Sequence, residues 1–329
     1  MKAILFLCLF LFMSSQDYKN PMEDINVENV DRAISSLPNK MSTQLDRMTN
    51  EMKDVKSKMN LNEAESAYFI FKWVTKNIQY DCYNTMLNPY GVQRTAEGTY
   101  MYGRAAGEGF SALYAKFADA LGIPVNTTSG YIKTEDLNNI GVEPTNPGHY
   151  WNYVKINSKG YLLDTAWASG YCNQYTFVPN YKEYYFCPNP QHLIYSHYPQ
   201  NSNFQLLNKT ITLKEFALMP YLSDIFFGHG FKSISPNEAI INAKEAVGTI
   251  SLTYEDKGIP NLYIQVLYKA GYGYYQELRN AARFEGNNGQ GKVTYMLRNR
   301  GEYILRIYYY EPGSYAYASL LTIYKIVYM

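Results

Sequence analysis

A glycine-rich loop that enters an apolar helix, followed by a histidine and an aspartate on short strands, constrains the fold of this chain more than any other feature. The helix is predicted over residues 107–121, because a glycine and then a proline follow it. His149 immediately precedes a strand-like segment at 150–156, Asp164 closes the next one at 161–164, and the turn at 157–160 joins the two as a hairpin. Since neighbouring strands bring their side chains together, we expect His149, Asp164 and the start of the helix to form one site.

This order of residues is typical of a cysteine triad whose nucleophile is missing. A catalytic cysteine usually stands at a helix N-terminus facing a histidine, and an aspartate orients that histidine. Here position 107 is glycine, which has no side chain to attack a carbonyl. Ser111 lies one helical turn further on and is expected to pack. Four further residues are predicted to line the adjoining cleft: Glu108, Trp151, Asn152 and Trp167.

Residues 64 to about 230 resemble the transglutaminase-like superfamily, and are closest to its kyphoscoliosis-peptidase branch. The matching motifs are Ala67-Tyr-Phe-Ile-Phe-Lys-Trp73 through Asn77-Ile-Gln-Tyr-Asp81, the block 103–124, His149-Tyr-Trp-Asn152 and Asp164-Thr-Ala-Trp167. The resemblance implies an α+β, papain-like core in which a helix packs on an antiparallel sheet, often followed by a β-sandwich. Where the family reads like Val-Cys-Glu-Gly, this chain has Ala106-Gly107-Glu108-Gly109.

Three functions compete on these observations. The first is a catalytically inactive protein, a pseudoenzyme whose cleft binds a peptide or protein. The second is an active cysteine-peptidase or transglutaminase-type acyl transferase that uses another nucleophile, or a water activated by His149 and Asp164, or whose cysteine is altered in this sequence. The third is a structural protein that makes its contacts elsewhere.

The chain is predicted to contain four parts. Residues 1–15 read as a signal peptide, 16–60 as a helical segment, 61–231 as the transglutaminase-like domain and 232–329 as an immunoglobulin-like β-sandwich. The last assignment is based on alternating segments at 248–254, 262–268, 292–297, 303–309 and 317–328.

An apolar stripe marks the helical segment. Its members are spaced by three or four residues: Met41, Leu45, Met48, Met52, Val55 and Met59. A coiled-coil partner would use such a stripe, but fewer than three heptads favour a helix packed on its own domain.

Several features indicate export. Lys2 precedes an apolar run at 3–13, which is too short to span a membrane. Asn126 and Asn208 begin glycosylation triplets. Cys172 and Cys187 are close enough in sequence to form a disulfide, which would leave Cys82 free or buried.

The predicted partners are a protein or peptide, with a glycan as a further option. The charge balance, 30 Lys and Arg against 29 Asp and Glu, gives no electrostatic reason for nucleic-acid binding. No cofactor motif is present, and His192, His197 and His229 have no metal-site spacing, so no metal is expected.

Overall fold

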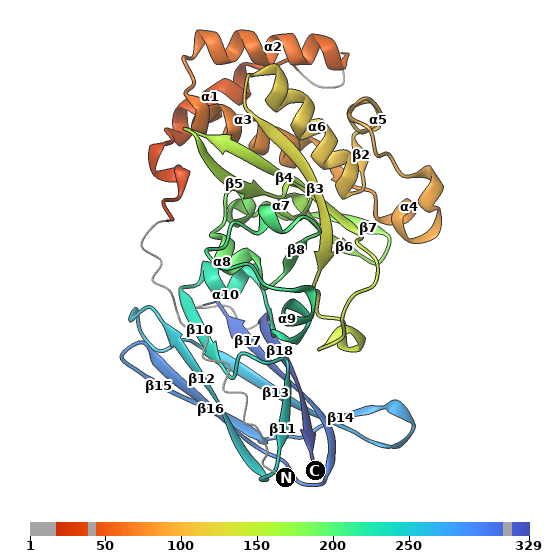
Figure 1. Ribbon diagram of the computed structural model, residues 1–329, viewed down its shortest axis with the longest axis vertical. Coiled ribbons are helices and arrows are strands. Elements are labelled where there is room, and N and C mark those ends of the chain that lie inside the picture. The colour runs from red at the N-terminus through yellow and green to blue at the C-terminus, as the bar shows by residue number, and fades with distance from the viewer. Residues whose placement is uncertain (1–17, 39–43, 312–317) are drawn as a thin grey trace.

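The computed structural model describes residues 18–38, 44–311 and 318–329, and two hydrophobic cores organise them. The first core gathers buried residues from Val30 to Leu193, and the second gathers residues from Leu222 to Ile326. Figure 1 shows the helical part and the β-sandwich at opposite ends of the molecule. The predicted signal peptide at 1–15 and Met41 lie outside the described residues. No helix in the described ranges has the length and apolar character needed to cross a membrane.

The helices belong mainly to the first part of the chain. Their bounds are α1 Val27–Ser36, α2 Leu45–Lys58, α3 Glu63–Asn77, α4 Cys82–Leu87, α5 Ala96–Tyr102, α6 Gly107–Ala120, α7 Thr165–Ser169, α8 Pro190–Leu193, α9 Leu213–Leu218 and α10 Asp224–Gly228.

Helix α3 begins at a reciprocal cap formed by two side chains. Asn62 accepts from the Glu65 amide and Glu65 accepts from the Asn62 amide, which completes a capping box. The helix is buried along most of its length, so it forms the centre of the first core.

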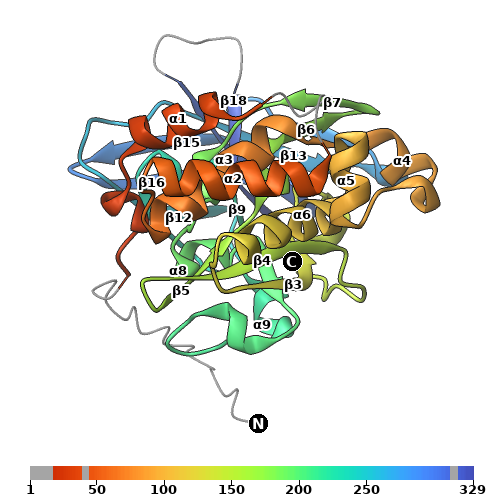
Figure 2. The same cartoon turned by 90° about the horizontal axis from the view of Figure 1, so that it is seen from above.

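Helix α2 packs on its own domain. Four members of the predicted apolar stripe are buried in the first core: Leu45, Met48, Met52 and Val55. Figure 2 shows α2 crossing over α3, with α5 and α6 alongside. The apolar stripe is therefore used within the chain, as the shortness of the pattern suggested.

The first part contains an antiparallel four-stranded sheet in the order β5-β4-β3-β8 and two short two-stranded pairs, β1-β2 and β6-β7. The strand bounds are β1 Gln79–Tyr80, β2 Arg104–Ala105, β3 Val125–Ile132, β4 His149–Ile156, β5 Lys159–Leu163, β6 Gly170–Asn173, β7 Thr176–Pro179 and β8 His197–Pro199. Helix α6 packs against β4 and β3, as expected for a helix laid on this sheet. The fold predicted for this region, a helix on an antiparallel sheet, is confirmed.

The last part is a β-sandwich of two sheets. One has the order β10-β12-β16-β15 and the other β11-β18-β17-β13-β14, with β9 also pairing with β18. The bounds are β9 Tyr221–Leu222, β10 Phe231–Ser235, β11 Ile240–Ala243, β12 Val247–Tyr254, β13 Leu262–Lys269, β14 Tyr275–Glu277, β15 Ala282–Asn287, β16 Gln290–Met296, β17 Gly301–Tyr310 and β18 Ala318–Tyr328. The predicted sandwich is confirmed. The five predicted segments correspond to β12, β13, β16, β17 and β18, and the shorter strands were not anticipated.

Candidate functional site

Helix α6 presents Gly107 as its first residue. The segment before it is held in place because β2 pairs in parallel with β1, and Gly103 takes the left-handed conformation that ends α5. The N-cap residue, Ala106, has no side-chain acceptor, so no side chain caps the amides of the first turn. A Cβ atom built at Gly107 would lie 2.9 Å from Nδ1 of His149 and 3.0 Å from its Cε1. Position 107 therefore faces the imidazole directly.

His149 and Asp164 form a buried pair. His149 is the first residue of β4, and Asp164 follows β5, the strand paired with β4. Nε2 of the imidazole lies 2.5 Å from Oδ2 of the carboxylate. Oδ1 of Asp164 accepts the amide hydrogen of Trp167 at 2.8 Å and so caps α7. The structure thus brings together the three residues predicted for the site, with one imidazole nitrogen on the carboxylate and the other toward position 107.

The carboxyl of Asp164 is held in its ionised form. Burial, the largest influence, would raise its pKa, but attraction to His149 and hydrogen bonds from two imidazoles outweigh it and lower the pKa below the usual value. Asp164 therefore acts as an acceptor for both rings.

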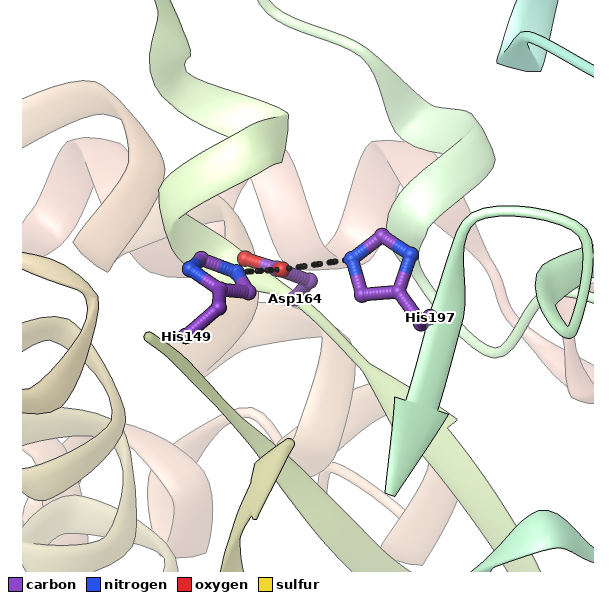
Figure 3. Close-up of side chains that lie close together, drawn as sticks. All are labelled: His149, Asp164 and His197. Atoms are coloured by element: carbon purple, nitrogen blue, oxygen red, sulfur yellow. Dashed lines mark hydrogen bonds and ion pairs between the residues drawn. The ribbon is translucent and has the colours of Figure 1, made fainter. Parts of the chain in front are cut away.

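The second ring belongs to His197, which sequence reasoning did not connect to the site. Strand β8 pairs with β3 and carries His197 to within 3.2 Å of the same Oδ2 atom. Its Nδ1 lies 2.8 Å from Oγ of Ser196. Burial lowers the pKa of His197, although its hydrogen bond to Asp164 opposes this effect. Figure 3 shows the two rings on either side of the carboxylate. No local pattern around residue 197 indicates this role.

The residues predicted to line the cleft have different positions. Trp151 is 1% exposed and Asn152 is fully buried, and the Asn152 amide donates to the Ser111 carbonyl. Neither side chain lines an open surface: Asn152 faces α6, and Trp151 points to the other face of β4, where it packs against His197. Glu108 and Trp167 remain partly exposed, and Glu108 pairs with Arg94 at 2.9 Å.

Two other potential nucleophiles have structural positions. The hydroxyl of Ser111 is buried and donates to the carbonyl of Gly107 at 3.0 Å, as expected for a packing residue. Cys187 is a free thiol inside the first core, and burial raises its pKa well above the usual value. A raised pKa disfavours the thiolate that nucleophilic attack requires.

The predicted disulfide is wrong. Cys172 is bonded to Cys82, at a Cα separation of 5.7 Å, and Cys187 is free. Cys82 is the first residue of α4 and Cys172 lies in β6, so the bond joins the segment before α5 to the hairpin after α7. Closeness in sequence favoured the wrong pair, whereas the fold places the two distant segments side by side.

Comparison with known proteins finds similarity to the same family as the motifs. Residues 50–177 match the model of the transglutaminase-like superfamily. The kyphoscoliosis peptidases of Mus musculus and Homo sapiens are each 24% identical, over 235 and 232 residues, covering 68% of this chain and 34% of their own length. Hillarin of Drosophila melanogaster is 23% identical over 232 residues, covering 65% of this chain and 27% of that protein. The chain thus spans about a third of the length of the first two relatives.

Proposed function

We propose that this chain, which carries a transglutaminase-like domain homologous to that of kyphoscoliosis peptidase, is a non-catalytic binding protein of the secretory pathway. The observation that supports this proposal is Gly107, which stands opposite Nδ1 of His149 where a nucleophile would be needed. The hydrogen bond between His149 and Asp164 connects the start of β4 to the N-cap of α7. Position 107 offers this pair no side chain to activate.

The proposed ligand is an extended peptide segment of a partner protein. The amide groups at the start of α6 suit a peptide carbonyl, because the N-cap residue supplies no competing side chain. The exposed surface beside them includes Gly148 and the partly exposed Glu108 and Trp167. Trp167 offers a ring face and Glu108 a charge, so the site would recognise a peptide through its backbone and one or two flanking side chains.

Export is part of the proposal. The apolar run after Lys2 supports a signal peptide, and the disulfide between Cys82 and Cys172 suits an oxidising compartment. Asn126 and Asn208 are both exposed, so both glycosylation triplets have room for a glycan.

The test compares the unmodified protein with Gly107→Cys and with the double variant Gly107→Cys, His149→Ala. Each is assayed for amine incorporation, peptide cleavage, labelling by a thiol-directed probe and binding to a peptide panel. We expect the unmodified chain to bind peptide without turnover, and the single variant to label faster than the double one.

Two results would contradict the proposal. Turnover by the unmodified chain would mean that another nucleophile or a water serves this site. If the protein bound no peptide but bound glycans, it would be a lectin. If it bound no peptide and its partner contacts mapped far from His149, a structural protein would be favoured.

A further inference from the structure

Three side chains from separate segments bring metal-binding atoms to one buried point. They come from β4, from the cap of α7 and from β8, and their ligand atoms all lie within 4.8 Å of one another. In Figure 3 both imidazoles turn a nitrogen toward the carboxylate of Asp164. We propose that His149, Asp164 and His197 bind a divalent transition-metal ion, with Zn²⁺ as the ion of first choice. This proposal is independent of the proposed binding function.

The contacts around the three residues leave the proposed ligand atoms facing one another. The Trp167 amide takes Oδ1 of Asp164 and leaves Oδ2 to face both rings. Ser196 takes Nδ1 of His197 and leaves Nε2 pointing at the same oxygen. Histidines that bind metals usually donate the N–H of their second nitrogen to such a partner. Ser196 already fixes the orientation of the His197 ring, and the tautomer would change on binding.

The chemistry of the set suits zinc. Two neutral imidazoles and one carboxylate, with a fourth position for water or a partner's donor atom, make a common zinc environment. In the structure the Nε2 atoms of both rings donate hydrogen bonds to the carboxylate. On binding, each ring would move its proton from Nε2 to Nδ1, and Oγ of Ser196 is placed to accept from Nδ1 of His197. No net proton is released if both rings begin neutral.

Zinc binding sets a distance for each of the three pairs of ligand atoms. Zinc bonds of about 2.0–2.1 Å at tetrahedral angles place ligand atoms roughly 3.3 Å apart. The pair of His197 and Asp164 already meets this at 3.2 Å, whereas His149 and Asp164 are 2.5 Å apart and must separate by about 0.8 Å. The two imidazole nitrogens lie on either side of this oxygen, within 4.8 Å of each other, and must also end about 3.3 Å apart.

The absence of a side chain at Gly107 leaves room for the His149 ring to move. The His149 ring would move away from Asp164 and toward α6, because its Nδ1 faces that helix. A Cβ atom at position 107 would stand 2.9 Å from Nδ1, in the path of the ring. The glycine that removes the nucleophile therefore also leaves the ring free to make room for an ion.

The experiment uses tag-free full-length protein, stripped with a chelator, incubated with Zn²⁺ and desalted. Metal content and calorimetric affinity are measured for the unmodified protein, Gly107→Ala and His197→Gln. Gly148→Ala and His229→Gln are the controls, because a Cβ atom at Gly148 meets nothing within 4 Å and His229 lies outside the cluster. Co²⁺ replaces Zn²⁺ in a parallel titration to report the coordination geometry by its visible absorption.

We expect one Zn²⁺ per chain, a higher unfolding midpoint with the ion, and affinity at least tenfold weaker in both test variants but unchanged in both controls. Gly107→Ala keeps all three ligands, so it remains informative if His197→Gln folds poorly. Absence of zinc in the desalted unmodified protein, or equal affinity in the test and control variants, would overturn the proposal.

Discussion

Nδ1 of His149 faces Gly107 so closely that a Cβ atom there would lie 2.9 Å away. The imidazole therefore stands directly opposite position 107. A side chain at position 107 would therefore displace the His149 ring and alter its hydrogen bond to Asp164.

The first prediction concerns that contact. In Gly107→Ala the His149 ring must shift, so its hydrogen bond to Asp164 weakens. In the proton NMR spectrum, the downfield resonance of the imidazole proton in this hydrogen bond should therefore move. Overpacking costs about 1–3 kcal/mol, offset by up to about 1 kcal/mol of helix propensity. We therefore expect a net loss of about 1 kcal/mol in denaturant unfolding, with Gly148→Ala close to the unmodified protein. Identical resonances and stabilities in the two variants would contradict the contact.

The second prediction concerns the disulfide. Peptide mapping without reduction should recover Cys82 linked to Cys172 and Cys187 as a free thiol. The double variant Cys82→Ser, Cys172→Ser should lose about 2–4 kcal/mol of unfolding free energy, because the bond closes a loop of 90 residues. A reducing agent should lower the unfolding free energy of the unmodified protein by the same amount and leave that of the double variant unchanged. Recovery of a peptide linking Cys172 to Cys187 would refute the pairing.

The third prediction is a loss of stability in mild acid. Burial lowers the pKa of His192 from 6.5 to about 4, and its ring stacks on Phe227 at 4.0 Å. The folded state therefore keeps the ring neutral while the unfolded chain takes up a proton, so stability is full above about pH 6.5 and falls as the pH drops toward 4.

His192→Phe keeps the ring stack and removes the titration. Urea unfolding at pH 7 and pH 5 should show a smaller acid loss in this variant than in the unmodified protein. Part of the loss should remain, because burial also lowers the pKa of His197. An equal loss in both proteins would exclude His192 as a source.

The fourth prediction concerns glycosylation. On expression through a eukaryotic secretory pathway, Asn126→Gln and Asn208→Gln should each remove one glycan, seen as a loss of mass that is sensitive to glycosidase. Asn203→Gln is the matched control, since Asn203 is exposed but begins no acceptor triplet. Secretion without any glycan would argue against the use of either triplet.

Local patterns in the sequence were sufficient to predict the main elements of the site. The glycine and proline after α6 and the turn between β4 and β5 act over a few residues, so they can be recognised without the fold. The same patterns place Gly107 at a helix start and His149 beside Asp164. The family motifs extend over the same region and agree with them.

Tertiary structure alone decided two other features. Sequence showed a missing nucleophile beside a histidine and an aspartate, but the pairing of Cys82 with Cys172 and the arrival of His197 at Asp164 depend on how distant segments pack. Strand β8 reaches the site because it pairs with β3, across more than 60 residues of intervening chain. Such long-range contacts are set by the packing of the whole core, and no spacing of residues along the chain encodes them.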